Sequence, residues 1–302
     1  MSIMVVGSVA FDTLKTPIGT RDKILGGSAT YFSLAASYFT KVRVVAVVGS
    51  DFTAEHENVM KARGIDTTGI ERANGKTFHW GGEYGENVNE AKTKFTDLNV
   101  FQEFQPRIPE QYADTEYLFL ANIDPTLQMQ VRRQMPKVKM VGGDTMNLWI
   151  NISRPQLTET LKEVDILLIN DGEAKLLAGE HSLPLAARKV LGMGPKAIVV
   201  KHGEYGATIF FQDGRHPFRA PALPIEEVHD PTGAGDSFAG GFIGYIASQG
   251  KLDRSVLTKA MFYGSVMGSF AVERFGTERL QSLSRAEIDK RFELFRDLTH
   301  LD

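Results

Sequence analysis

The sequence predicts an α/β protein built on a mostly parallel central sheet. Short apolar runs recur along the chain, and stretches in which apolar residues repeat with helical spacing lie between most of them. Strands that are apolar throughout are typical of a sheet that is buried on both faces. Because strand and helix alternate, we expect parallel strands with helices covering the sheet.

Seven apolar runs are the expected strands of this sheet. They cover residues 3–6, 42–48, 117–121, 138–141, 166–169, 197–200 and 207–211. Helices are expected between them, over residues 28–39, 54–63, 125–135 and 184–191. No linker rich in Pro, Gly or Ser divides the chain, so we expect a single domain over residues 1–302.

After Gly235 the pattern changes to long apolar stretches that are rich in small residues. Residues 237–248 and 255–272 predict two helices, whose glycines allow them to pack closely. A final amphipathic helix is expected over residues 285–297, because its apolar residues repeat with helical spacing.

Two segments show neither strand nor helix periodicity. Residues 75–105 are interpreted as exposed strands that form a flap, and residues 11–24 are a candidate to pair with it. A plain surface excursion is the alternative that the pattern leaves open.

Composition excludes several classes of function. The 302 residues are 42% hydrophobic and 24% charged, and 34 Lys and Arg against 37 Asp and Glu give a net charge of −3. This balance argues against nucleic acid as a partner. The chain has no cysteine, which removes disulfides, thiolate zinc sites and iron–sulfur clusters. No apolar stretch reaches the length of about 18 residues that a membrane span needs, so we expect a cytoplasmic protein without a membrane partner.

Two common nucleotide motifs are absent. In residues 69–77 five residues separate the glycines, where a phosphate loop needs four. The turn after the first expected strand has only Gly7, which does not provide the close approach to pyrophosphate of a dinucleotide fold.

The most informative segment is Asp230-Pro231-Thr232-Gly233-Ala234-Gly235-Asp236, which leads directly into a helical run. Small residues at a helix start allow several backbone amides to converge at the positive end of the helix dipole, which makes an anion site. Asp236 in the first turn is either a residue that stabilises the dipole or a general base beside the anion.

This segment closely resembles the carboxy-terminal signature of the PfkB (ribokinase-like) carbohydrate kinases, a family that includes adenosine and other nucleoside kinases. Other elements agree with the family in their order along the chain: Gly7 and Asp12, Gly26-Gly27-Ser28-Ala29, Asn170-Asp171-Gly172-Glu173 and Lys201-His202-Gly203-Glu204-Tyr205-Gly206. The resemblance implies a three-layer α/β/α ribokinase-like fold with a small β-lid formed by about 11–24 and 75–105.

The resemblance also implies catalytic roles. Asp236 would take the proton from the attacking hydroxyl, and the amides of Gly233, Ala234 and Gly235 would stabilise charge on the transferred phosphoryl group. Asn170 and Glu173 would hold Mg²⁺ through water. Their plainer role is a helix cap, with Asn170 or Asp171 at the N-cap and Glu173 in the first turn, and both roles are compatible.

ATP is implied to contact Lys201, Gly203, Gly206 and Thr232. From their spacing alone, Gly203 and Gly206 also fit a tight turn between the strands at 197–201 and 207–211.

On the acceptor side, the resemblance implies that Asp12 and Asp230 bind the substrate, while Gly26 and Gly27 leave room for a sugar ring. The β-lid would close over this substrate and exclude water.

Two departures leave the acceptor open. Many members carry an Asn shortly after the double glycine, in the region where this chain has Thr30 and Tyr31. Asp144-Thr145-Met146-Asn147 resembles the family's Asp-x-Asn strand end, but Trp149 close by indicates an unusual pocket wall.

We therefore expect an ATP-dependent kinase that phosphorylates a hydroxyl of a small sugar or polyol. A nucleoside kinase is the alternative, and a catalytically silent binding protein or an oligomerisation module are further ones. ATP and Mg²⁺ are the expected cofactors, with a monovalent cation left open. The expected partners are the small-molecule acceptor and a second copy of the chain, as a homodimer through the lid.

Overall fold

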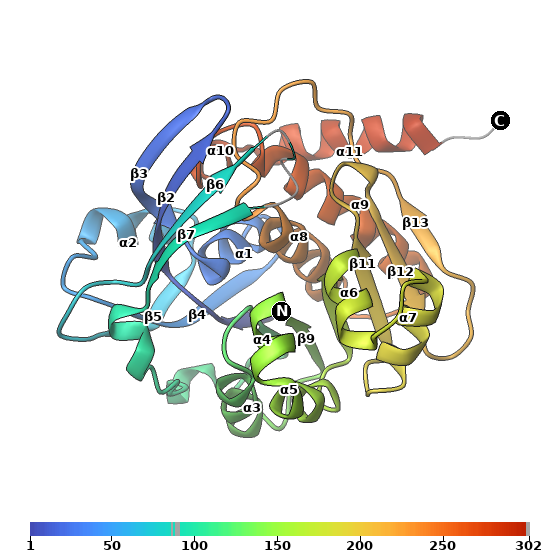
Figure 1. Cartoon of the computed structure of the whole chain (residues 1–302), viewed down its shortest axis with the longest axis horizontal. Helices are drawn as coiled ribbons and strands as arrows, with labels where there is room; N and C mark the ends of the chain where they lie inside the picture. Colours follow the sequence, from blue (N-terminus) through green and yellow to red (C-terminus); the bar gives the residue numbers. More distant parts are fainter. Residues whose placement is uncertain (86, 88–90, 300–302) are drawn as a thin grey trace.

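The computed structural model describes residues 1–85, 87 and 91–299. Within these residues, a nine-stranded sheet forms the centre of the protein (Figure 1). In spatial order its strands are β13 (Phe218–Ala220), β12 (Ala207–Phe211), β11 (Ala197–Lys201), β10 (Ile166–Asn170), β9 (Met140–Asp144), β8 (Tyr117–Leu120), β1 (Ser2–Val6), β4 (Lys41–Val48) and β5 (Asp66–Arg72). Every neighbouring pair from β11 to β5 is parallel, while β12 and β13 join antiparallel. The mostly parallel sheet is confirmed.

Helices cover both faces of this sheet. One face packs against α1 (Ser28–Ala36), α2 (Ala54–Lys61), α8 (Ala234–Gln249), α9 (Arg254–Ala271), α10 (Glu278–Ser282) and α11 (Arg285–Thr299). The other packs against α3 (Pro125–Gln134), α4 (Asn147–Ile152), α5 (Arg154–Leu161), α6 (Asp171–Ala178) and α7 (Leu183–Leu191). Because strand side chains alternate, Ile3 and Val5 belong to the first core and Met4 and Val6 to the second. The result is three layers, as the resemblance implied.

Glycines hold α8 tightly between its neighbours. A Cβ atom added at Gly240 would lie 2.4 Å from the carbonyl oxygen of Phe32 in α1, and one added at Gly241 would lie 2.5 Å from that of Tyr263 in α9. The small residues of this stretch therefore allow the helix backbones to touch, as the sequence predicted. The helix that carries Asp236 is fixed in place by these contacts.

A second sheet stands beside the central one. Within the described residues it has four strands in the order β3 (Gly19–Gly26), β2 (Ala10–Thr16), β6 (His79–Tyr84) and β7 (Ala91–Asp97) (Figure 1). The segments 11–24 and 75–105 thus meet, because β2 pairs with β6. The segment after β7 is not a strand but the 3₁₀ helix η1 (Asn99–Glu103). Residues 86 and 88–90 of the expected flap lie outside the described residues.

The strand expected at residues 138–141 is displaced in the structure. β9 runs over Met140–Asp144, so its end carries Asp144. Gly142 lies inside this strand, where there is no room for a side chain. A Cβ added there would lie 2.9 Å from Phe119 and 3.0 Å from Ile243. As a consequence, Asp144, Asn170 and Lys201 end three consecutive strands at the carboxyl edge of the sheet.

None of the described helices is long and apolar enough to cross a membrane.

Candidate active site

The start of α8 has backbone amides that lie in a partly exposed segment. Gly233 precedes the helix in the left-handed conformation, with φ 72°. The amide of Ser237 is already bonded to the Gly233 carbonyl at 2.8 Å, so the amides of Gly233 and Gly235 lie before the regular helix bonds begin. Residues 231–236 are all partly exposed to solvent. A ligand can therefore reach the positive end of α8.

One of the three amides expected in this anion site has another partner. The Ala234 amide donates to the Pro231 carbonyl at 3.2 Å, which closes a tight turn. Glycine is required at position 233, where φ is 72° and an added Cβ would lie 2.3 Å from the ring of Tyr31, whereas an added Cβ at Gly235 would lie 3.0 Å from the Nζ atom of Lys201, a flexible side chain.

Asp236 lies in the first turn of α8 among other acidic side chains. Burial of the carboxyl group raises the pKa of Asp236 to about 8, and the charges of Asp144, Asp12 and Glu173 add to this, while Lys201 opposes it. A carboxyl group that titrates close to neutral pH is well matched to accept a proton from a hydroxyl group.

Lys201 is the cation of this cluster. Its Nζ atom lies 3.5 Å from the Asp144 Oδ2 atom. Burial lowers the pKa of Lys201. The negative charges of Asp144, Glu173 and Asp236 have the larger effect, so the pKa of Lys201 is raised overall. Burial also raises the pKa of Asp144, against the attraction of Lys201. The expected site residues did not include Asp144, although the segment Asp144-Thr145-Met146-Asn147 had been singled out as resembling a strand end of the family.

Asn170 and Glu173 form the helix cap that the sequence left as one of two roles. The Asn170 side chain accepts from the Glu173 amide, and the Glu173 carboxylate accepts from the Asn170 amide, both at 2.8 Å. Burial raises the pKa of Glu173 to about 7, with Asp144 as the next cause. Glu173 keeps its Oε1 atom, which this cap does not use, and the Asn170 Oδ1 atom keeps its second lone pair.

The donor set at this edge fits Mg²⁺ bound through water. Carboxylate and amide oxygens are the ligands that Mg²⁺ prefers, and crowded carboxylates favour a cation between them. Among the described residues no group of three or more His, Cys, Asp or Glu side chains stands close enough to hold a metal by itself. Water molecules and substrate phosphates would therefore complete the coordination.

Asp12 and the double glycine come together in the smaller sheet. Burial raises the pKa of Asp12 to about 7, with Asp230 as the second cause, while the Gly27 amide bonds to the carboxylate and opposes both. An added Cβ at Gly26 would lie 1.9 Å from the Asp12 Oδ2 atom. Gly26 is thus required for the position of Asp12, rather than only for room around a ligand.

Asp230 holds two loops together. It is fully buried, and its two oxygens accept from the amides of Thr232 at 2.9 Å and Gly276 at 2.8 Å. Burial raises the pKa of Asp230. The structure therefore gives Asp230 a supporting position behind the anion site, where both of its carboxylate oxygens have protein partners.

Gly203 and Gly206 form the turn between β11 and β12. Gly203 begins the 3₁₀ helix η3 (Gly203–Tyr205), and the Gly206 carbonyl accepts from the His202 amide at 2.7 Å. An added Cβ at Gly206 would lie 2.1 Å from the Ala220 carbonyl oxygen. This turn follows Lys201, whose Nζ atom lies close to Gly235 of the anion site.

Two tyrosines that the sequence did not assign to the site contact its loop. The ring of Tyr31 in α1 lies against Gly233, and the Thr232 hydroxyl donates to the Tyr84 hydroxyl at 3.0 Å. Tyr84 comes from β6, so the smaller sheet reaches the start of α8. No periodicity or motif marks Tyr84 in the sequence, whereas Tyr31 lies where the sequence departs from the family that it resembles.

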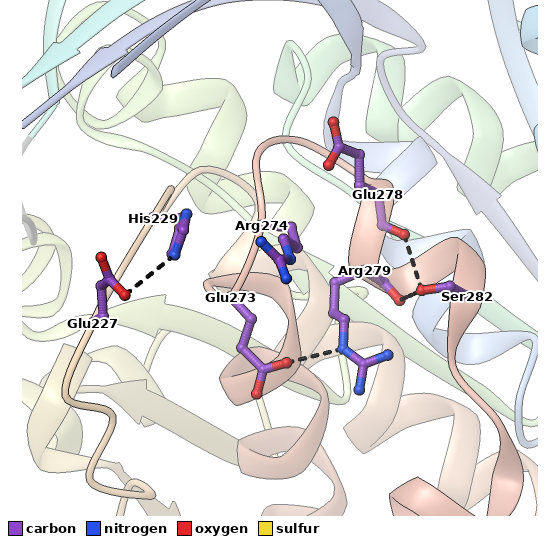
Figure 2. A pocket seen from close by; sticks show the side chains of 7 residues that line it. All are labelled: Glu227, His229, Glu273, Arg274, Glu278, Arg279 and Ser282. Carbon is purple, nitrogen blue, oxygen red and sulfur yellow. Dashed lines mark hydrogen bonds and ion pairs between the residues drawn. The ribbon is translucent and has the colours of Figure 1, made fainter. Parts of the chain in front are cut away.

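A surface cavity of about 800 Å³ is lined by residues from two segments, with Glu227 and His229 from one and Glu273 to Ser282 from the other (Figure 2). Its charged lining is largely paired, with Glu273 bound to Arg279 and Arg291, and Glu227 near His229. None of the residues that carry the acidic cluster lines it. The cavity therefore lies beside the candidate site and is not part of it.

Comparison with known proteins finds a matching family and similar relatives. The model of the pfkB family carbohydrate kinases matches residues 2–282. The cytidine kinase of Thermococcus kodakarensis is 34% identical over 251 residues, which cover 80% of this chain and 87% of that protein. The nucleoside kinase of Methanothermobacter thermautotrophicus is 24% identical over 310 residues, covering 91% of each.

Solved structures show the same fold. The Burkholderia thailandensis nucleoside kinase in complex with inosine has a TM-score of 0.80 at 21% identity, covering 97% of this chain and 98% of that one. A putative ribokinase II from E. coli in complex with ATP and Mg²⁺ has a TM-score of 0.79 at 21% identity, covering 97% and 99%.

Proposed function

The chain belongs to the pfkB family of carbohydrate kinases, and from this premise we propose that it transfers the γ-phosphate of ATP to a hydroxyl group of a nucleoside, with Asp236 as the general base. The observation that carries the proposal is the position of Asp236. Its carboxyl group, with a pKa of about 8, lies one residue beyond a glycine-lined and solvent-accessible helix start.

The residues divide the work of the transfer among them. The oxygen of the acceptor hydroxyl bonds to the γ-phosphorus, and Asp236 accepts the proton that this hydroxyl loses. The bond from the γ-phosphorus to the bridging oxygen breaks, and its electron pair leaves with ADP. The amides of Gly233 and Gly235 stabilise the negative charge on the transferred group. A silent binding protein would have no need for a base at this place.

Asn170, Glu173 and Lys201 are proposed to serve the phosphates. Lys201 offsets negative charge, and Asn170 and Glu173 orient the water shell of Mg²⁺, which neutralises phosphate charge when bound. Thr232, Gly203 and Gly206 border the ATP side. A monovalent cation is a further proposal, and a rate that depends on potassium at constant ionic strength would support it.

Relatives favour a nucleoside as the acceptor. The proteins that match over most of this chain include those named cytidine kinase and nucleoside kinase. Asp12 faces the same cluster as Asp236 and is suited to accept hydrogen bonds from ribose hydroxyls. A free sugar or polyol is the second candidate, because a relative that matches part of the chain is named ribokinase.

A panel of acceptors tests the proposal. Release of ADP is measured with ATP and Mg²⁺ in the presence of cytidine, uridine, adenosine, inosine, ribose, fructose or myo-inositol. We expect release with at least one nucleoside, and release with sugars alone would move the assignment to the second candidate. If no acceptor supports release, the proposed function is wrong.

We also propose a homodimer that forms through the smaller sheet. The expected location of the protein is the cytoplasm. β7 is an edge strand that is exposed along its whole length, which suits it to pair with a second copy. Light scattering coupled to size exclusion would give the mass, and a monomer at micromolar concentration would exclude the dimer.

A further inference from the structure

Tyr84 is the point where the smaller sheet touches the anion site. It is the last residue of β6, and its hydroxyl receives a hydrogen bond of 3.0 Å from Thr232, a residue 148 positions later in the sequence. Thr232 directly precedes Gly233, whose peptide begins the anion site. The contact thus links the sheet that would act as a lid to the loop that would hold the phosphoryl group.

The Tyr84 hydroxyl keeps a hydrogen that it has not used. It accepts the bond from Thr232, so its own hydrogen is free to donate, and no described residue accepts it. Burial raises the pKa of Tyr84 well above its usual range, and the charges of Asp230, Asp12 and Asp236 add to this, while the bond from Thr232 opposes it. Tyr84 therefore stays protonated at neutral pH, as a donor close to these carboxylates.

The same loop is fixed from a second direction. The ring of Tyr31 lies against Gly233, and Tyr31 is 1% exposed with no partner for its hydroxyl among the described residues. Tyr31 comes from α1 in the central layers, whereas Tyr84 comes from the smaller sheet. Gly233 thus contacts a helix of the central layers, whereas the side chain of Thr232 is held by the smaller sheet and depends on the position of that sheet.

Side chains elsewhere on β6 make contacts within the smaller sheet. Glu83, the neighbour of Tyr84, binds Lys15 at 2.7 Å and Lys94 at 2.9 Å, and His79 bonds to Thr13 at 2.8 Å. Because side chains alternate along a strand, Glu83 and Tyr84 point to opposite faces of the sheet. A change at Glu83 therefore breaks only exposed ion pairs, which contribute little to stability, and leaves the link of the sheet to Thr232 in place.

We propose that Tyr84 is a positioning residue for phosphoryl transfer, whose bond to Thr232 fixes the first peptide of the anion site only when the lid is closed. This inference rests on the proposed function. It makes closure of the lid and completion of the anion site one event, so that ATP is activated only when an acceptor is enclosed. Loss of the bond leaves the site intact but loosely held.

Three single variants and one double variant test the proposal. Tyr84→Phe keeps the ring, Thr232→Val removes the donor, and Glu83→Gln is the control on the opposite face. We expect Tyr84→Phe to lower kcat about tenfold with little change in the KM for ATP, and to raise the ratio of ATP hydrolysis without acceptor to transfer. The double variant should be no worse than the stronger single variant, because one shared bond is lost. Thr232→Ser should restore the coupling to Tyr84.

Hydrogen exchange tests the link without any acceptor. Loss of one hydrogen bond should make the amides of residues 79–84 exchange about fivefold faster in Tyr84→Phe and Thr232→Val than in the unchanged chain, and not in Glu83→Gln. If exchange rises as expected but the acceptor panel is silent, the link stands and the proposed function fails. If kcat and exchange of folded Tyr84→Phe stay within twofold of the unchanged chain, or if the two single effects add, the proposal is wrong.

Discussion

The carboxylate of Asp144 lies 3.5 Å from the ammonium group of Lys201. The two residues end β9 and β11, on either side of β10. Lys201 lowers the pKa of Asp236, against burial and three carboxylates that raise it. A single cation from this ion pair thus opposes the acidic cluster around the proposed base.

Replacing Lys201 should move the pH dependence of the reaction. A base works in its deprotonated form, so kcat/KM for the acceptor should rise with pH, with a limb near the pKa of about 8 of Asp236. Lys201→Gln removes the cation that favours the carboxylate, so the limb should move to higher pH. Lys196→Gln, which breaks an exposed pair with Asp165, is the control. A limb that stays in place would disprove the role of Lys201.

Asp236→Asn should remove most of the turnover. Loss of a general base lowers the rate by about 10²–10⁴-fold, while the Asn side chain keeps the size of the residue. ATP affinity measured by calorimetry should change little, because the anion site is made of amides. Asp171→Asn, also in the first turn of a helix but half-exposed, is the control. Turnover within a few-fold of the unchanged chain would contradict the assignment.

The same substitution should stabilise the fold at alkaline pH. Because the folded-state pKa of Asp236 is raised from 3.8 to about 8, its contribution to stability is fully present below 3.8 and is lost as pH rises through about 8. Asn carries no charge at any pH and avoids this loss. We expect Asp236→Asn to have a Tm several degrees higher at pH 8.5, and a smaller advantage at pH 5.5. An advantage that is equal at both values would argue against the raised pKa.

Gly233→Ala should disable the anion site. The residue has φ 72°, and an added Cβ would lie 2.3 Å from the Tyr31 ring, so the peptide has to move. We expect a loss in kcat of about 10²–10³-fold, the range for loss of one such donor. Gly64→Ala is a matched control, because Gly64 has φ 70° but no atom within 4 Å of an added Cβ. It should lose about 1–2 kcal/mol of stability and keep its activity. Equal activity losses in the two variants would show that backbone strain alone is responsible.

Glu173→Gln separates the two roles of this residue. Gln supports the same capping box, so the Tm should stay close to that of the unchanged chain. The loss of negative charge should raise the Mg²⁺ concentration for half-maximal rate by about 10–100-fold. Glu173→Ala should lose both the cap and the metal response. An unchanged Mg²⁺ response in Glu173→Gln would exclude Glu173 from the metal site.

The central layers were predictable because their signals are local. Apolar runs such as residues 42–48 and 197–200 became β4 and β11 with shifts of one residue. β5 was missed because Asp66–Arg72 is a polar edge strand, whose pairing with β4 depends on a distant segment. The short helices α4 and α5 carry too few turns for a clear period.

The candidate site was predictable where one segment contains it. Residues 230–236 predict a helix start with an acidic residue in the first turn, and the structure has both. The contribution of Tyr84 was not predictable, because it reaches the site from another element. Asp144 and Tyr31 lie in segments that the sequence singled out, but no pattern placed their side chains beside Asp236 and Gly233. Their proximity arises only when the strands are placed side by side.

The glycines that seat α8 between its neighbours also limit how this protein can change over evolutionary time. An alanine at position 240 or 241 would meet a main-chain oxygen of α1 or α9, and neither neighbour can rotate away as a side chain would. New acceptor preferences are therefore more readily acquired through the strands of the smaller sheet than through the helix that bears Asp236. Directed evolution toward other alcohols should accumulate its mutations there, and leave the glycines of α8 untouched.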